Sequence, residues 1–347
     1  MKSDKVIVQL PLRIDLAGGW SDTPPVCYQY GGTVLNAAVA LEGECPVRAE
    51  VKRLEKSVVK VESADLKKKG VLTKREEIYG EQDPNDWCAL VKCALNVTGY
   101  EFDRGGLSIR ISANVPKGSG MGTSSILGAS LVKALLTLRD GEEPDWQIVA
   151  ERTLALEQTM QTGGGWEDQL GALVPGVKLI TTKPGRNQKF KVERLSAAAE
   201  KKFAKFLKER GVLYFTGQKR MARNVLRGVL DFCRRNPEGI ASAIIKALKR
   251  DAAEAFAALE RGDFTTYTAK ANSYWLNKKA LDPGSTNAQV ESIIARIAPW
   301  TEAVSLCGAG GGGFLFAIAR SKAAREKMLR VLKTAGNGGK SYAFSIV

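Results

Sequence analysis

The stretch PKGSGMGTSSILGA, residues 116 to 129, joins a predicted strand to a predicted helix through a glycine-rich loop. Before it, residues 106 to 115 alternate apolar and polar side chains, which is the period of a half-buried strand. After it, apolar side chains recur with a helical period until Gly141. This order of strand, glycine loop and helix predicts backbone N–H groups and a positive helix end that can approach an anion.

The loop differs from two familiar phosphate-binding loops. No Gly-Lys-Ser/Thr follows its glycines, as a Walker A loop requires, and the dinucleotide-binding pattern with a later acidic residue is absent from its sequence. A simpler alternative is a tight turn in which Thr123 or Ser124 caps the helix. By itself, the loop leaves both interpretations open.

Two carboxylates that follow the loop, eleven residues apart, favour a phosphate site. Glu157 falls on a predicted helix over 146 to 159, and Asp168 follows the glycines at 163 to 165. The hydroxyl of Ser124 with the Glu157 carboxylate is a ligand set that Mg²⁺ takes beside nucleotide phosphates, because this ion prefers hard oxygens. Asp168 could orient or deprotonate an acceptor hydroxyl. Each acid could instead be an ordinary charge on a helix face or a cap.

Composition limits the class of protein. A chain of 347 residues predicts two domains or one large domain. The net charge of +15 favours an anionic partner such as a nucleotide, a phosphorylated substrate, nucleic acid or anionic lipid, unless it serves solubility alone. Histidine is absent and the six cysteines form no C-x-x-C pair, so a zinc site and a histidine-based triad are excluded.

Other patterns bear on partners and location. Arg220, Arg223 and Arg227 are spaced to share one face of a predicted helix over 219 to 235. The chain has no run of 18 apolar residues, and its first ten residues resemble a strand rather than a secretory signal. We therefore expect a cytoplasmic protein with no membrane partner.

The predicted elements change character along the chain. Up to about residue 115 the chain is mostly strands and turns, and the segment 162 to 182 is predicted to return to strand after two helices. Long helices follow over 197–210, 219–235, 240–261 and 265–281, and then a mixed end with strands over 302–306 and 341–347. This pattern predicts domains at 1–183 and 184–347.

Three separated stretches resemble a known family. LPLRIDLAGGWSDTPP (10–25), PKGSGMGTSSILGA (116–129) and CGAGGGGF (307–314) resemble motifs 1, 2 and 3 of the GHMP kinases, in that order. The long first motif, with TGGGWEDQLG and LYFTGQKRMARNVL, is most similar to the L-fucokinases, and bacterial heptose 7-phosphate kinases are close relatives. The resemblance implies an α+β fold, with an N-terminal domain like domain 2 of ribosomal protein S5 and a ferredoxin-like C-terminal domain.

The resemblance also implies roles for individual residues. Asp168 would contact the acceptor hydroxyl, Arg13 would lie near that acid and the transferred phosphoryl group, and Ser124 with Glu157 would hold Mg²⁺. The residues implied for ATP binding are Lys117, Gly118, Ser119, Gly120, Met121, Gly122, Thr123, Ser124 and Ser125. Those implied for sugar binding are Trp20, Asp22, Thr23, Gly164 and Gly165, and those of motif 3 are Gly308, Gly310 and Gly311. Asp15, in the same stretch as Arg13, is interpreted as structural.

The function implied is an ATP-dependent sugar 1-kinase acting on L-fucose. A methyl sugar needs an apolar wall, which Trp20, Pro24, Pro25 and Trp166 could supply unless the tryptophans are core residues. A heptose 7-phosphate, the alternative substrate, would need a basic cluster, and the stretches around motif 1 and Asp168 contribute only Arg13.

Two departures and one different class complete the expectations. The N-terminal extension and pyrophosphorylase region of the fucokinases are absent from this sequence, so a bifunctional enzyme is not expected, and Tyr30 stands where we expect a histidine. A nonenzymatic nucleic-acid binder is the competing class, but no aromatic residues interleave with the basic stripe. We expect a small sugar and ATP as partners, and no nucleic acid; the sequence does not decide the oligomeric state.

Overall fold

The structure is a computed structural model that describes residues 4–79, 83, 86–101, 105–116, 118–160, 162–218, 229, 231, 233, 239–335 and 338–347. Its chain forms two compact units that are both discontinuous in sequence. Unit 1 comprises Met1–Leu12, Glu44–Val115 and Gly122–Val174, and unit 2 comprises Arg13–Gly43, Pro116–Met121 and Pro175–Val347. Both contain helices and strands, so the predicted α+β class is confirmed.

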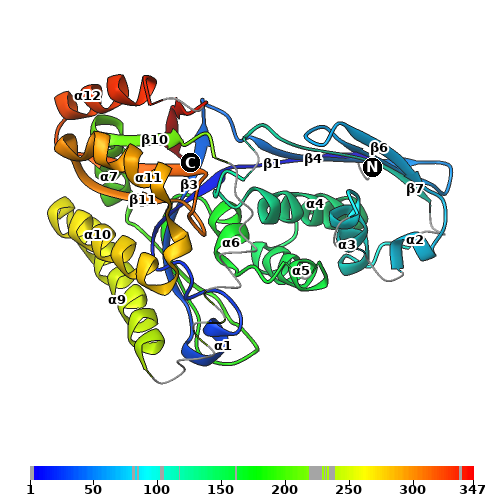
Figure 1. The fold of residues 1–347 in the computed structure, drawn as a ribbon. Helices are drawn as coiled ribbons and strands as arrows, with labels where there is room; N and C mark the ends of the chain where they lie inside the picture. Colours follow the sequence, from blue (N-terminus) through cyan, green and yellow to red (C-terminus); the bar gives the residue numbers. More distant parts are fainter. Residues whose placement is uncertain are drawn as a thin grey trace. The chain divides into compact units, whose positions relative to one another are not determined.

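Unit 1 is a five-stranded sheet with helices packed on one face (Figure 1). The strands, in sheet order, are β1 (Lys5–Leu10), β4 (Val47–Leu54), β7 (Gly106–Ala113), β5 (Val59–Ser63) and β6 (Lys68–Leu72). Neighbours are antiparallel except for the parallel pair of β5 and β7. The helices are α2 (Glu76–Tyr79), α3 (Ala89–Val97), α4 (Thr123–Asp140), α5 (Trp146–Thr159) and α6 (Glu167–Leu173).

Helix α4 is the central helix of unit 1 and begins where the glycine loop ends. Its two flanking residues, Gly122 and Gly141, are both left-handed, with φ of 74° and 87°, a conformation that glycine adopts without a steric penalty. Between them, the apolar residues Leu131, Val132 and Leu135 are buried against the sheet and the neighbouring helices. The predicted helical period over this segment therefore matches the structure.

Unit 2 contains two further sheets. One has the order β14 (Phe344–Ile346), β3 (Thr33–Leu41), β8 (Val177–Thr181) and β9 (Lys191–Arg194), with β2 (Leu12–Ala17) also pairing with β3. The other has the order β11 (Thr301–Leu306), β12 (Phe314–Ala319), β10 (Gly211–Phe215) and β13 (Lys340–Tyr342). Tyr214, Leu306 and Leu315 are buried in the core below this second sheet.

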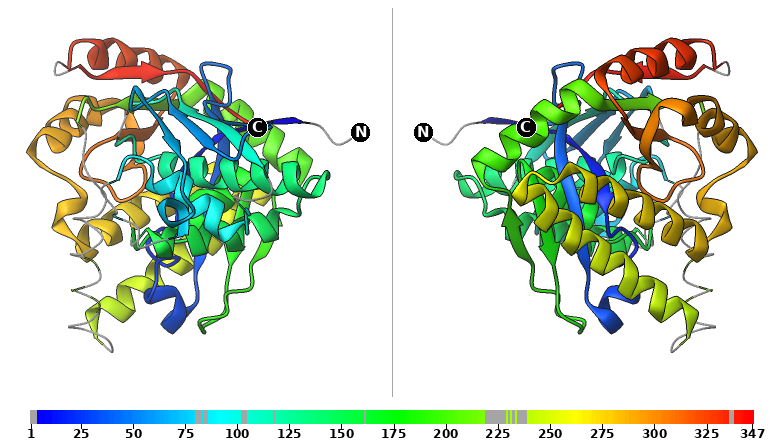
Figure 2. Two further views of the ribbon diagram at one scale, coloured as in Figure 1. Left: turned by 90° about the vertical axis from the view of Figure 1, so that its right-hand side faces the viewer. Right: turned by 90° about the vertical axis from the view of Figure 1, so that its left-hand side faces the viewer.

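The helices of unit 2 are α1 (Val26–Tyr30), α7 (Ala197–Arg210), α9 (Ile240–Arg261), α10 (Phe264–Leu281), α11 (Ala288–Ile297) and α12 (Lys322–Lys333), with short 3-10 turns at Pro283–Ser285 and Ala298–Trp300. Helices α9 and α10 lie side by side (Figure 2). Helix α9 also packs against β3, whose residues after Thr33 are all buried.

Several elements differ from the sequence prediction. The segment 162 to 182 contains the short helix α6 before β8, and seven helical residues are too few to show a clear period. The predicted final strand divides into β13 and β14, which belong to different sheets. Strand β10 and helix α11 were not predicted. The predicted helix over 219 to 235, with its arginines at 220, 223 and 227, lies outside the described residues except at 229, 231 and 233.

The predicted domain boundary after residue 183 falls inside unit 2, which begins its last segment at Pro175. Each compact unit consists of three separate segments of the sequence, whereas the predicted domains are contiguous. The boundary therefore stays a prediction. In the part of the chain that the structure describes, no helix is both long and apolar enough to span a membrane.

The N-terminus of α5 provides a stability test, because this helix carries Glu157. The carboxylate of Asp145 accepts a hydrogen bond of 2.7 Å from the backbone N–H of Gln147. We expect Asp145→Ala to lower the free energy of unfolding by about 1 kcal/mol, measured by urea denaturation, because the cap is lost. Asp145→Asn keeps an acceptor and should lose much less. Equal losses for both variants would contradict the capping role.

Candidate functional site

Arg13 lies in the buried strand β2 of unit 2 and contacts the glycine loop. Its side chain is 2 % exposed, and its Nη1 donates a 2.8 Å hydrogen bond to the carbonyl oxygen of Gly120. A buried guanidinium needs acceptors fixed around it, because an unsatisfied buried charge is costly. The residue implied for catalysis in motif 1 is therefore held against the loop implied for phosphate binding in motif 2.

The glycines of motif 3 pack on the same loop. A Cβ on Gly308, whose φ is +62°, would lie 2.5 Å from the carbonyl oxygen of Gly120, and one on Gly313 would lie 2.4 Å from that of Ser119. The backbone N–H of Phe314 also donates to the Ser119 carbonyl at 2.8 Å. These approaches leave no room for a side chain. Unit 2 thus brings together parts of all three motifs.

The start of α4 in unit 1 carries the predicted acid. A Cβ on Gly122 would lie 2.9 Å from Cγ of Asp168, which belongs to the first turn of α6. Ser125 Oγ donates to Asp168 Oδ2 at 3.5 Å. Gly122 itself is the N-cap residue of α4, so neither Thr123 nor Ser124 occupies that position. The alternative in which Thr123 or Ser124 caps α4 is therefore wrong.

Glu157 lies close to the same hydroxyl. It sits in the last turn of α5, is 2 % exposed, and accepts a hydrogen bond from Thr162 Oγ1. Burial raises the pKa of this carboxyl; the nearby hydroxyls of Thr162 and Ser125 oppose the rise, and the charge of Asp168 adds to it. Its second oxygen, Oε1, has no hydrogen-bond partner among the described residues.

This carboxylate fits Mg²⁺, which the family implies. A buried oxygen without a donor and a neighbouring hydroxyl are hard ligands of the kind that this ion takes. Within the described residues, no group of three or more histidine, cysteine, aspartate or glutamate side chains could hold a metal. A site with one carboxylate suits an ion that keeps waters and binds substrate phosphates.

The hydroxyl beside the two acids is that of Ser125, whereas Ser124 is exposed. Successive residues of a helix point in directions about 100° apart, so a run of Thr-Ser-Ser places only one hydroxyl on a given face. The sequence contains the run, but the identity of the inward-facing member depends on where the helix begins. The metal role of Ser124 stays a prediction, and Ser125 becomes a second candidate.

The residues implied for sugar binding lie in both units. In unit 2, Trp20, Asp22 and Thr23 are buried; Trp20 has a φ of 75°, which is strained for a bulky residue, and its Nε1 has no partner among the described residues. In unit 1, Trp166 is buried at the N-cap of α6. A Cβ on Gly164 would lie 3.3 Å from Glu157 Oε2, and Gly165 follows it in the same loop. Lys117 lies outside the described residues.

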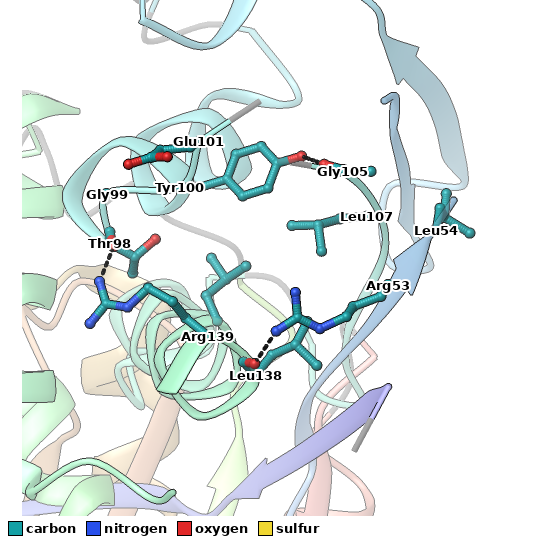
Figure 3. A pocket seen from close by; sticks show the side chains of 12 residues that line it. Arg53, Leu54, Thr98, Gly99, Tyr100, Glu101, Gly105, Leu107, Leu138 and Arg139 are labelled. Atoms are coloured by element: carbon teal, nitrogen blue, oxygen red, sulfur yellow. Dashed lines mark hydrogen bonds between the residues drawn. The ribbon is translucent and has the colours of Figure 1, made fainter. Parts of the chain in front are cut away.

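A cavity of about 330 Å³ lies at the opposite end of α4 from its first turn (Figure 3). Arg53 Nη2 donates to the carbonyl oxygen of Leu138, and Arg139 Nη1 donates to that of Thr98. Arg139 also forms a two-point pair with Asp140. Because α4 has 18 residues, roughly 27 Å of helix separate this cavity from Gly122, and it is not the predicted phosphate site.

The raised pKa of Glu157 predicts a pH-dependent cost to stability. A carboxyl with a folded pKa above its usual 4.5 carries no penalty below that pH, and the penalty grows as pH rises through the folded pKa. We expect Glu157→Gln to raise the free energy of unfolding by about 1 kcal/mol near pH 7.5, and the gain should vanish below pH about 4.5. Urea denaturation across this pH range measures it.

The matched control is Glu151→Gln, because Glu151 is exposed on the same helix. This variant should change the free energy of unfolding little at any pH. A gain for Glu157→Gln that is independent of pH would contradict the electrostatic explanation.

Comparisons with known proteins agree with the three motifs. The GHMP kinases N terminal domain model matches residues 89–176, and the GHMP kinases C terminal model matches residues 245–338, together just over half of the chain. Among solved structures, galactokinase of Lactococcus lactis complexed with galactose superposes with a TM-score of 0.73 at 18 % identity, covering 99 % of this chain and 94 % of that one.

Three curated relatives align with most of the chain. The bifunctional fucokinase/GDP-fucose pyrophosphorylase of Arabidopsis thaliana is 36 % identical over 98 % of this chain and 32 % of its own length. The L-fucokinase/L-fucose-1-P guanylyltransferase of Bacteroides fragilis is 31 % identical over 95 % and 36 %. The D-glycero-alpha-D-manno-heptose 7-phosphate kinase of Campylobacter jejuni is 28 % identical over 89 % and 87 %. The chain thus spans about a third of the first two relatives.

The matched family models, the fold and the meeting of the motif residues confirm the family resemblance. The chain belongs to the GHMP kinases.

Proposed function

We propose that this chain is an ATP-dependent sugar kinase that phosphorylates the C1 hydroxyl of free L-fucose. The alignment with two proteins whose names include fucokinase, at 36 % and 31 % identity across nearly the whole chain, supports this substrate. Both relatives are about three times as long and are also named for a nucleotidyl-transfer activity. The proposal for this chain concerns the kinase reaction alone, in the cytoplasm.

The observation that carries the proposal is the pair of carboxylates beside the first turn of α4. Glu157 and Asp168 share the hydroxyl of Ser125 as a neighbour. The helix start offers N–H groups and a partial positive charge to phosphate oxygens. A phosphate site next to an acid that can accept a proton is what phosphoryl transfer to a hydroxyl requires.

In the proposed reaction, the C1 oxygen of the sugar attacks the γ-phosphorus of ATP. The bond from that phosphorus to the bridging oxygen of ADP breaks, and the C1 hydroxyl proton passes to the Asp168 carboxylate. Phosphoryl transfer leaves little covalent work for the protein, so the rate depends on alignment and charge neutralisation. Arg13 and the loop N–H groups would neutralise charge on the transferred group.

Bound Mg²⁺ would neutralise charge on the ATP phosphates, and Glu157 with Ser124 or Ser125 would hold it. The chain's own part is to keep a buried carboxylate in place without a proton. Burial raises the pKa of this group, and the charge of a bound cation would oppose that rise.

The buried Trp20 supports a sugar with an apolar side. L-Fucose has a methyl group where most hexoses carry a hydroxymethyl, and an indole can cover it while its N–H bonds a hydroxyl. The N–H of Trp20 is buried and has no hydrogen-bond partner among the described residues. A heptose 7-phosphate is the second candidate, supported by the Campylobacter jejuni relative.

Replacing the proposed base provides one test. We expect Asp168→Asn to lower kcat by at least about 100-fold, because the amide keeps the shape but accepts no proton. Steady-state kinetics with ATP and L-fucose measure this. Glu151→Gln, which removes an exposed carboxylate from α5, should retain the wild-type kcat. Near-normal turnover of Asp168→Asn would rule out its role as a base.

The substrate is tested by ATP consumption over free sugars and sugar phosphates, with NMR of the product. We expect turnover of L-fucose to a product phosphorylated at C1. Activity only on the heptose 7-phosphate would move the assignment to the second candidate. Salt-dependent RNA binding without any ATP turnover would instead favour the nucleic-acid binder.

A further inference from the structure

Unit 2 buries an ion pair beneath the motif residues. Lys278 of α10 and Asp15 of β2 are 0 % and 1 % exposed, and Lys278 Nζ lies 3.4 Å from Asp15 Oδ2. The same ammonium donates to the carbonyl oxygen of Leu306 at 2.9 Å. Tyr274 Oη donates to Asp15 Oδ2 from the preceding turn of α10. The lysine thus connects two strands that are far apart in sequence.

Each of these strands leads to a motif residue. Asp15 follows Arg13 by two positions on β2, so both side chains leave the same face of the strand. Leu306 ends β11, two residues before Gly308. A shift of either strand would therefore be transmitted to Arg13 or to motif 3.

The 3-10 turn that follows α10 also contacts motif 3. The carbonyl oxygen of Ser285 accepts a 2.6 Å hydrogen bond from the N–H of Gly311, and the Ser285 hydroxyl donates to the carbonyl oxygen of Lys278 at 3.3 Å. A Cβ on Gly310 would lie 2.4 Å from the same Ser285 oxygen. Motif 3 is consequently held just before its first residue by Lys278 and at its middle by Ser285.

Stability alone does not account for this arrangement. The attraction within a buried ion pair often fails to offset the cost of removing both charges from water, and apolar residues of similar size often stabilise a core as well or better. Asp15 Oδ1 and the buried Tyr267 hydroxyl have no hydrogen-bond partner among the described residues, so the network carries further cost. The lysine instead fixes the position of two groups relative to each other, because Asp15 and the Leu306 carbonyl must both stay within reach of one ammonium group.

We propose that Lys278 is a positioning residue that fixes Arg13 and motif 3 against the carbonyl oxygen of Gly120. This inference rests on the proposed kinase function, in which Arg13 acts on the transferred phosphoryl group. Arg13 donates to the Gly120 oxygen, and a Cβ on Gly308 would lie 3.3 Å from Arg13 Nη2 as well as against that oxygen. Lys278 holds the strands that carry both.

A double-mutant cycle separates positioning from a general structural role. We expect Lys278→Met to lower kcat about 100-fold, the scale of a small misplacement of a catalytic group, with little change in KM. In an Arg13→Ala background, the same substitution should lower kcat by less than about threefold, because the group that it positions is already gone. An equal loss in both backgrounds would overturn the proposal.

Two further variants serve as controls, one for folding and one for the loss of a buried lysine. Lys278→Met leaves Asp15 charged and buried, so Asp15→Asn/Lys278→Met removes both charges and is the variant in which folding is checked by melting temperature. The matched control is Lys178→Met, which removes another lysine that is 0 % exposed in unit 2 and donates to the Gly176 carbonyl oxygen. It should keep kcat within about twofold of wild type.

Amide hydrogen exchange tests the proposal without any turnover. In folded Asp15→Asn/Lys278→Met, we expect exchange over residues 118–121 and 306–313 to accelerate at least about tenfold, with β3 unchanged. If the wild type phosphorylates no sugar, the proposed function fails and this exchange result decides the inference. Unchanged exchange at both loops would overturn it.

Discussion

The positions of the motif residues in unit 2 depend on their contacts with the carbonyl oxygen of Gly120. It accepts a hydrogen bond from the buried Arg13, and Gly308 packs against it so closely that a Cβ would lie 2.5 Å away. A backbone oxygen can serve both neighbours only if one offers a donor and the other offers no side chain. The arginine in motif 1 therefore supplies the hydrogen-bond donor to this oxygen, and the glycine in motif 3 leaves the space that the oxygen occupies.

In unit 1, the predicted metal ligand Glu157 is buried at a cost in solvation. Glu157 is buried with one oxygen lacking a donor among the described residues, and its raised pKa reflects that desolvation. Buried ionisable groups of this kind are common at functional sites, because a bound ligand can supply the interactions that the folded chain does not. The Lys278–Asp15 pair in unit 2 is also buried at a cost in solvation. What this pair provides is a fixed position for the two strands rather than a site for a ligand.

Long periodic elements were predictable from the sequence, and orientations were not. Helices α5, α7 and α9 have the predicted bounds because 14 to 22 residues repeat a clear apolar period. Helix α6 is too short for that signal, although it carries Asp168. The roles that the three motifs imply for the site residues stay predictions. Whether Ser124 or Ser125 faces the acids depends on the residue at which the helix begins, which the sequence does not specify.

The interleaving of the two units has a consequence for how such a gene can be divided. A fragment ending at residue 183 would contain β3 and β8 but would leave β14 and α9 behind, and β3 pairs with β14 and packs on α9. Its apolar residues would then face water, which is a hazard for aggregation. A division of this chain near residue 183 would therefore split the β3 sheet of unit 2 rather than separate two folded parts.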